Sequence, residues 1–414
     1  MTRIYRRGLR PAALAATLVL VFVAPAAAQF FGGPQKPKGP WMDKSLSPDK
    51  RADLLIEQMT LDEKISLVHG TGWRFGPPEL LPPSRSLGGA GFIPGIIRLG
   101  IPDLQLSDAA AGVANGDAFG RYSTPLPSDI AEAASWDVKV AREYGALIGR
   151  ELRDQGFNMS LGGGVDLTRE PRNGRNFEYQ GEDPVLAGTM VGAMMKGQQD
   201  EGVVGDLKHY AMNDSENGRN YADIKAAKRA MRESDLLAFE IALRDSDAGA
   251  VMCSYNLING DYACENDYLL DEVLKKNFGF KGFVISDWGA THSTAKAAMA
   301  GLDMEQPGEE FFGPKLKKAV ESGEVPMSRL NDMVHRILRS EIAAGLFDNP
   351  PHRQVPDIFK GFEVARHVAE SGSVLLKNAN NQLPLNASKL KTIAVIGSHA
   401  DVGVLSGGGS AQVQ

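Results

Sequence analysis

Polar residues able to do chemistry directly follow short apolar runs at four points along the chain. Asp108 follows LQLS, Lys208 and His209 follow VVGDL, Tyr255 follows AVMCS, and Asp287 follows FVIS. Short apolar runs bounded by such residues are typical of buried strands. Because the carboxyl ends of parallel strands meet at one edge, we expect these side chains to form a single site.

Asp287 has the most specific chemistry, because it stands at the end of an apolar run and precedes Trp288. A carboxylate in that position can act as a nucleophile toward the anomeric carbon of a sugar. The structural alternative is that Asp287 caps a helix starting near Thr291, since aspartate is common at helix N-caps.

Lys208 and His209 are adjacent and could together bind the hydroxyls of a polyol. A lysine at a strand end could instead form a Schiff base, as in aldolases. A third reading is an ion-paired lysine beside a structural histidine. The next loop holds Asn213, Glu216 and Arg219, and this density of polar groups favours a ligand site.

Nucleotide and metal chemistry find little support in the motifs. Arg169, Arg172 and Arg175 form a cluster, but no G-x-x-x-x-G-K-[ST] phosphate loop is present. The segments LGGGVD and SGGGSA do not give G-x-G-x-x-G, and the seven histidines contain no H-x-x-x-H pair. We therefore predict neither a cofactor nor a metal.

The composition is that of an ordinary globular protein. The 414 residues include 45 Lys+Arg and 51 Asp+Glu, for a net charge of −6. This balance argues against a nucleic-acid partner, because such proteins are typically basic. At about 150 residues per domain, the length predicts two or three domains.

The N-terminus has the pattern of a secretory signal, predicted over residues 1–28. Basic residues precede an apolar run over 11–23, and Ala26-Ala27-Ala28 supplies the cleavage site. A membrane anchor is the alternative, but the run falls short of the roughly 20 residues that span a bilayer. We expect an exported protein, periplasmic or extracellular, with no membrane contact after cleavage and a flexible lead over 29–45.

Export would place the two cysteines in an oxidising environment. Cys253 and Cys264 flank an Asn-Gly turn and could form a disulfide across it. They could equally be two separate buried thiols, because spacing alone does not fix disulfide geometry.

The fold class predicted is α/β, with a (β/α)8-type barrel over residues 46–347. Strand candidates recur every 30 to 60 residues with helical patterns between them. One such helix carries Val140, Tyr144, Leu147 and Leu152 on one face, with Gly156 at its end. A doubly wound open sheet is the alternative.

After the barrel, residues 348–376 read as a linker that leads into a helical pattern beginning at Val364. Residues 377–414 read as the start of a second α/β sandwich domain, with a buried strand over 391–398. The sequence ends 17 residues after Gly397, and a domain needs roughly 50 residues for its own core. We expect this second domain to be incomplete.

The sequence as a whole resembles family 3 of the glycoside hydrolases, particularly the β-glucosidases. The resemblance rests on REPRNGRNFEYQGEDP, GDLKHYAMNDSENGR, VMCSYNLING and FVISDWGA, in family order across about 170–290. Weaker similarity covers about 45–414. It implies a barrel followed by an α/β sandwich domain, and a retaining, exo-acting enzyme that needs no cofactor and hydrolyses β-linked glucosides or short oligosaccharides.

The resemblance also implies roles for individual residues. Asp287 corresponds to the nucleophile, and Lys208 and His209 correspond to a pair that binds the glycone. The remaining substrate-binding positions are Arg175 and Arg219, Tyr255 beside the nucleophile, Asp108 at the far hydroxyls of the ring, and Trp288.

The chain departs from the family pattern at two places. Ala109-Ala110 follow Asp108 where the family has Gly-Pro, and Asn173 stands where the family has Trp. These changes alter the pocket around Asp108 and Arg175, and so the preferred sugar.

Two-domain members of the family take their acid/base glutamate from the second domain, so we expect that group beyond Gln414. Glu216 reads as a binding or structural residue. Three alternatives stay open: a sugar-binding protein without turnover, a β-xylosidase of the same family, and a Schiff-base lyase using Lys208. The oligomeric state is not predicted.

Overall fold

The computed structural model describes residues 39–72, 84–114, 122–404 and 407–413. The predicted signal segment over 1–28 lies outside these residues. No helix in the described part of the chain is both long and apolar enough to cross a membrane.

A six-stranded sheet forms the centre of the fold, in the order β1-β2-β3-β4-β6-β9. Its first pair is antiparallel and every other neighbouring pair is parallel. The four apolar runs predicted to lead to the site residues all lie in this sheet, in β2, β4, β6 and β9. The strands are β1 (Gly91–Ile93), β2 (Leu104–Ser107), β3 (Met159–Gly164), β4 (Val204–Tyr210), β6 (Ala250–Cys253) and β9 (Phe283–Ser286).

The predicted α/β class is confirmed, as a sheet curled into a half-barrel rather than eight regular parallel strands. Beyond β9 the described residues continue the parallel pattern as single bridges, Ile285 with Met304 and His69 with Glu305. A second, three-stranded sheet consists of β5 (Asp223–Ile224), β7 (Leu257–Ile258) and β8 (Asp261–Tyr262).

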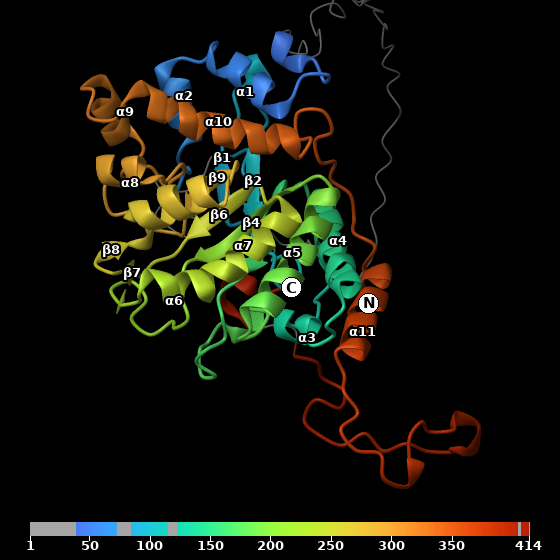
Figure 1. Ribbon diagram of the computed structural model, residues 1–414. Coiled ribbons are helices and arrows are strands. Elements are labelled where there is room, and N and C mark those ends of the chain that lie inside the picture. The colour runs from blue at the N-terminus through green and yellow to red at the C-terminus, as the bar shows by residue number, and fades with distance from the viewer. Residues whose placement is uncertain (1–38, 73–83, 115–121, 405–406, 414) are drawn as a thin grey trace, which may run out of the picture. The chain divides into compact units, whose positions relative to one another are not determined.

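Helices pack along the outside of the central sheet, where α4, α5 and α7 lie side by side (Figure 1). The longer helices are α1 (Pro48–Ile56), α4 (Val138–Gln155), α5 (Pro184–Asp200), α7 (Asp235–Ser246), α9 (Pro314–Glu321), α10 (Met327–Ala343) and α11 (Ile358–Ser371). The shorter ones are α2 (Leu61–Leu67), α3 (Asp129–Ala133), α6 (Lys228–Glu233) and α8 (Ala295–Ala300), and a π-helical segment, η6, spans Tyr268–Asn277.

Local sequence signals set the bounds of α4 and α5. The Asp183 side chain accepts hydrogen bonds from the first amides of α5, with Pro184 as its first residue. Gly156 ends α4 with a φ of +91°, a backbone conformation that favours glycine. The two helices approach closely at Gly145, where an added Cβ would lie 1.8 Å from the Met194 carbonyl oxygen.

Cys253 and Cys264 form a disulfide, with 5.2 Å between their Cα atoms. This resolves the two readings that the sequence left open. The bridge joins the end of β6 to the segment after β8, next to the strand that precedes Asp287.

The predicted flexible lead over 29–45 is wrong for its final residues. Trp41 lies in a short 3-10 helix, η1 (Pro40–Met42), and is buried. Its indole nitrogen donates to the Leu99 carbonyl oxygen at 3.0 Å. Burial of a large indole with its polar atom satisfied fixes this part of the lead against the α/β core.

The predicted linker over 348–376 contains helix α11, which begins six residues before Val364, where the helical pattern was expected to start. Asp357 accepts a hydrogen bond from the Lys360 amide and so caps the start of the helix. The helix begins directly after this capping residue, whereas the prediction relied on the apolar pattern that begins at Val364, and this difference explains the earlier start.

The strand predicted over 391–398 does not form in the structure. Ile393, Val395 and Ile396 are exposed, and no strand is assigned in that range. A strand needs neighbours for its main-chain groups and its apolar faces, and the described residues place none beside this segment.

Buried Asp303 anchors strand β9, and so the position of Asp287, to two helices. It accepts hydrogen bonds from Lys275 Nζ at 2.8 Å, from Arg329 at 2.7 Å and from the Val284 amide at 2.8 Å. Burial lowers the pKa of Lys275 to about 7, so this ammonium depends on the Asp303 charge.

We therefore expect Asp303→Ala to lower the free energy of unfolding by about 3–5 kcal/mol, because it leaves buried cations without their partner. Urea denaturation followed by circular dichroism measures the change. Asp332→Ala is the matched control, since Asp332 also binds Arg329 but its side chain is 42% exposed. That variant should change stability by no more than about 1 kcal/mol, and equal losses in the two would contradict the assignment.

Candidate active site

Asp287 follows strand β9 directly, and its position is set by main-chain contacts. Its amide donates to the Cys253 carbonyl oxygen at 3.1 Å, and its Oδ1 accepts from the Trp288 amide at 2.8 Å. The helix-cap alternative is wrong, because the next helix, α8, begins at Ala295 after the N-cap Thr294. Asp287 therefore has no structural task at a helix end.

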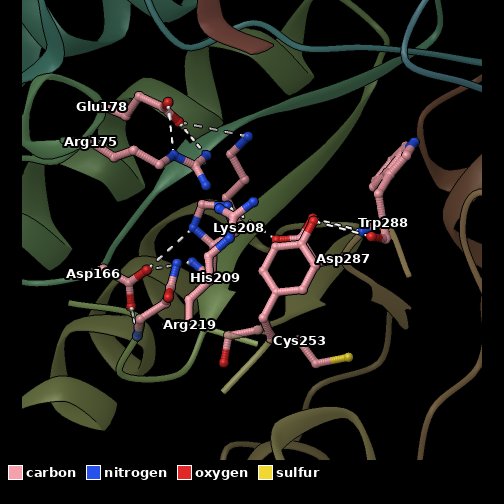
Figure 2. Close-up of polar contacts among 12 residues, drawn as sticks. Asp166, Arg175, Glu178, Lys208, His209, Arg219, Cys253, Asp287 and Trp288 are labelled. Carbon is pink, nitrogen blue, oxygen red and sulfur yellow. Dashed lines mark hydrogen bonds and ion pairs between the residues drawn. The ribbon is translucent and has the colours of Figure 1, made fainter. Parts of the chain in front are cut away.

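A cavity of about 760 Å³ opens at the carboxyl ends of the strands, and Asp287 lines it. The structure brings all eight residues predicted for the site into its lining. These are Asp108, Arg175, Lys208, His209, Arg219, Tyr255, Asp287 and Trp288. Lys208 and His209 lie within β4 rather than after it, and Figure 2 shows them beside Asp287.

Glu178 holds the cationic wall of the cavity together. It accepts two hydrogen bonds from Arg175, at 3.1 and 2.8 Å, and its Oε2 lies 4.0 Å from Lys208 Nζ (Figure 2). Its side chain is only 2% exposed. Burial alone would raise the pKa of Glu178, but the charges of Arg175 and Lys208 outweigh it and lower that pKa below its usual value. The acid is therefore ionised.

Asp108 lies on the other side of Lys208, with 3.9 Å between its Oδ1 and Nζ. Burial raises the pKa of Asp108 to about 6, against the opposing charge of Lys208. Near neutral pH this carboxylate is a hydrogen-bond acceptor that faces the cavity. It lies next to the Lys208 ammonium, which keeps hydrogen atoms to donate to a ligand.

His209 links the cavity to the buried layer behind it. Its Nε2 lies 3.6 Å from Asp287 Oδ2, and its Nδ1 lies 3.3 Å from Asp166 Oδ2. Burial, together with the charges of Arg175 and Lys208, keeps the pKa of His209 well below its usual value. The imidazole is therefore neutral at physiological pH.

Arg219 and Tyr255 form another part of the cavity wall. The Arg219 guanidinium carbon lies 4.2 Å from the centre of the Tyr255 ring, and its Nη1 donates to Glu216 at 2.6 Å. The Tyr255 hydroxyl donates to the Trp288 carbonyl oxygen at 3.3 Å. Burial and the nearby Asp287 carboxylate raise the pKa of Tyr255, so this hydroxyl keeps its hydrogen.

Sequence reasoning missed several residues of the site. Glu178, Phe177 and Met252 line the cavity, and Asp166 supports His209 from behind. Glu178 could have been found, because it follows Arg175 by three residues and an arginine that lines a cavity needs a counter-charge. Asp166 comes two residues after the end of β3, near the carboxyl ends of the strands.

The segment 407–412 also contributes to the lining, at Gly407, Gly408, Gly409, Ser410 and Gln412. It lies more than 100 residues after Trp288 in the sequence, so local pattern could not place it here.

The site combines hydrogen-bond donors and acceptors with the carboxylate of Asp287, which pairs with the neutral His209 and with no lysine or arginine among the described residues. Among the described residues, no cluster of histidine, cysteine, aspartate and glutamate has an arrangement that could hold a metal ion. The arrangement suits a neutral ligand rich in hydroxyl groups, because cationic donors alternate with carboxylate acceptors around the cavity.

Two family models match the chain. The glycosyl hydrolase family 3 N-terminal domain matches residues 96–340, and the family 3 C-terminal domain matches residues 373–414.

Similar proteins include a probable β-glucosidase K of Emericella nidulans, 36% identical over 365 residues, which cover 87% of this chain and 41% of that protein. A β-glucosidase of Bacteroides ovatus is 33% identical over 402 residues, which cover 90% of this chain and 51% of that protein. The chain spans about half the length of the curated relatives it matches.

Similar solved structures include β-glucosidase 3B from Thermotoga neapolitana in complex with glucose, with a TM-score of 0.80 and 34% identity. The match covers 88% of this chain and 52% of that one. A β-glucosidase from Streptomyces venezuelae in complex with D-glucose gives a TM-score of 0.73 and 36% identity, over 81% of this chain and 43% of that one.

The ion pairs of Glu178 predict a large and pH-dependent loss of stability in Glu178→Gln. We expect the free energy of unfolding to fall by about 2–4 kcal/mol at pH 7, because Arg175 and Lys208 lose a buried counter-charge. The pKa of Glu178 is lowered in the folded state, so its stabilising effect is present above about pH 4.5 and fades as the pH falls below that value. Denaturant titrations of the wild type and the variant at pH 7 and pH 3.5 measure the loss of stability at neutral pH and its decrease in acid.

Glu170→Gln is the matched control on the same loop. Glu170 also binds an arginine through two hydrogen bonds, to Arg172, but that arginine side chain is 88% exposed. We expect a change below about 1 kcal/mol. A Glu178 variant as stable as this control would contradict the role of Glu178 as the buried counter-charge.

Proposed function

Because this chain belongs to glycosyl hydrolase family 3, we propose that it carries the nucleophile and glycone site of a retaining, exo-acting β-glycosidase. The substrates would be β-D-glucosides and short oligosaccharides with a terminal β-D-glucosyl residue. The observation that supports this best is the placement of Asp287, which has no structural partner at a helix end and stands in a cavity lined with hydroxyl-binding groups.

In the first step, Asp287 would attack the anomeric carbon through Oδ2. The Trp288 amide holds Oδ1 at 2.8 Å, which leaves the other oxygen directed toward His209 and the cavity. The bond from carbon to the aglycone oxygen would break as the bond to Asp287 forms, and the leaving oxygen would take a proton from a second carboxylic acid. Water would then release the sugar with its original configuration.

Glycone binding would use the groups around Asp287 as matched donors and acceptors. Lys208, Arg175 and Arg219 can donate to sugar oxygens, and Asp108 can accept from two hydroxyls at the far side of the ring. Hydrogen bonds to ionised groups are stronger than neutral ones, so this set can position a neutral sugar tightly. The lining by Trp288 and Phe177 adds apolar surface for the sugar ring or the aglycone.

We assign no acid/base residue within the described part of the chain. Glu216 lines the cavity, but its two oxygens are held by Arg219 at 2.6 Å and by Asn213 at 3.1 Å. Both oxygens of Glu216 are thus engaged by neighbouring side chains, so Glu216 is not offered to a leaving group. The family resemblance suggests a glutamate of the C-terminal domain for this step.

We also propose that the protein works outside the cytoplasm, in the periplasm or beyond the cell. Two features support this: the signal pattern over residues 1–28 and the disulfide between Cys253 and Cys264. Structural disulfides form and persist in oxidising compartments.

A fluorinated substrate tests the nucleophile directly. We expect a 2-deoxy-2-fluoro-β-glucoside with an activated leaving group to label Asp287, because the fluorine slows release of the covalent intermediate more than its formation. Peptide mass spectrometry of the whole protein locates the label. Asp287→Asn should take up none, whereas Asp261→Asn, which alters an exposed carboxylate, should label normally. A label on any other residue would falsify the assignment.

A pair of substrates separates an enzyme from a sugar-binding protein. For this 414-residue chain we expect cleavage of 2,4-dinitrophenyl β-glucoside and, for cellobiose, a rate at least about 100-fold lower, since general acid catalysis contributes about 10²–10⁴-fold. Initial rates by absorbance and by glucose release measure the two.

Glucose binding without cleavage of either substrate would favour the non-catalytic alternative. Faster cleavage of the corresponding β-xyloside would favour a xylosidase.

A further inference from the structure

Tyr179 lies behind the cavity and contacts His209 on the side away from Asp287. It follows the short helix η4 (Asn176–Glu178) and is fully buried. Its hydroxyl oxygen lies 3.1 Å from His209 Nδ1, with the two rings perpendicular. Among the described residues, this nitrogen is the one hydrogen-bond partner that the hydroxyl has.

The number of hydrogen atoms available to the two groups determines which atom donates. A tyrosine hydroxyl carries one hydrogen, and a buried donor is almost always satisfied. Burial raises the pKa of Tyr179, so the hydrogen stays on its oxygen and must go to Nδ1 of His209. Nδ1 therefore accepts and carries no hydrogen, and a neutral imidazole has its single hydrogen on the other nitrogen.

We infer that Tyr179 is a positioning residue that holds the hydrogen of His209 on Nε2. That atom lines the cavity side of the ring, 3.6 Å from Asp287 Oδ2. A glycone hydroxyl between the two groups would accept from Nε2–H and donate to the Asp287 carboxylate. The tautomer is a property of the free protein, whereas its effect on sugar binding rests on the proposed function.

Asp166 is the neighbour that would favour the opposite tautomer. Its Oδ2 lies 3.3 Å from Nδ1 and accepts from the His209 amide at 3.1 Å, and its Oδ1 accepts from the Asn213 amide at 3.3 Å. The Tyr179 hydroxyl lies closer to Nδ1, at 3.1 Å, and its single hydrogen has no other partner among the described residues, whereas Asp166 Oδ2 already accepts from the His209 amide. The Tyr179 hydroxyl therefore decides the outcome.

The same geometry predicts what happens when the hydroxyl is removed. Without the Tyr179 donor, Nδ1 can carry the hydrogen and give it to Asp166 at 3.3 Å. Nε2 would then present a lone pair to the cavity, next to the Asp287 carboxylate. Two acceptors side by side cannot share a sugar hydroxyl as donor and acceptor, so binding of the glycone weakens.

Nitrogen-15 NMR of the histidine-labelled protein tests the tautomer without any substrate. The His209 signals are assigned by their loss in His209→Gln. In the wild type we expect a protonated Nε2 and an unprotonated Nδ1, and in Tyr179→Phe we expect the two to exchange roles. Tyr210→Phe is the matched control, because it removes another buried hydroxyl, bonded to the Leu269 carbonyl, and should leave the His209 tautomer unchanged.

Kinetics with an aryl β-glucoside supply a second readout. We expect Tyr179→Phe to lower kcat/KM about tenfold, mainly through a higher KM, which corresponds to the loss of one hydrogen bond. Tyr210→Phe should keep the wild-type KM.

A wild-type His209 protonated at Nδ1 would overturn the inference even if Tyr179→Phe fails to fold. So would a tautomer unchanged in the variant. If the wild type shows the Nε2 hydrogen but no glycoside is cleaved or bound, the proposed function fails and the tautomer assignment stands.

Discussion

The site depends on one buried negative charge, the carboxylate of Glu178. Arg175 and Lys208 both face the cavity, with side chains 14% and 4% exposed, and two cations so little exposed and so close together would repel each other and lose hydration. Glu178 compensates both, through two hydrogen bonds to one and a longer contact to the other. Because both carboxylate oxygens of Glu178 accept hydrogen bonds from Arg175, Lys208 keeps hydrogen-bond donors for a ligand. A cavity rich in donors is therefore possible inside an otherwise well-packed core.

The same principle of paired charge holds the strand that carries Asp287. Asp303 joins Lys275 and Arg329 to the Val284 amide, three residues before Asp287 in the sequence. The disulfide of Cys253 secures the neighbouring strand, and the Cys253 carbonyl receives the Asp287 amide. Asp287 is thus placed by main-chain contacts from two strands that are each anchored elsewhere. Such fixed placement suits the nucleophile role proposed for Asp287, because small errors in position cost large factors in rate.

The sequence predicted those parts of the molecule in which local pattern and structure coincide. The strands that carry or precede Asp108, Lys208, Tyr255 and Asp287 are four to seven residues long. They form because their apolar residues are buried in a parallel sheet, and the carboxyl ends of such strands converge. What it missed depends on contacts far apart in the chain. The burial of Trp41 requires the Leu99 carbonyl. The run over 391–398 has the composition of a strand, but the described part of the chain places no strand beside it. Composition reports what a segment can form, whereas pairing decides what it does form.

Residues 407–413 show why the cavity cannot be understood from the half-barrel sheet and its helices alone. Gly407 packs against Phe177 so closely that an added Cβ would lie 2.3 Å from its ring. Ala411 and Val413 are buried, and Val413 lies against Gly112, just after Asp108. This segment falls within the range that matches the family's C-terminal domain. The cavity wall is therefore shared between residues from both family domains, and the glycine at 407 is required by the approach of the two segments. Any ligand of this cavity must accommodate that contact as well as the groups around Asp287.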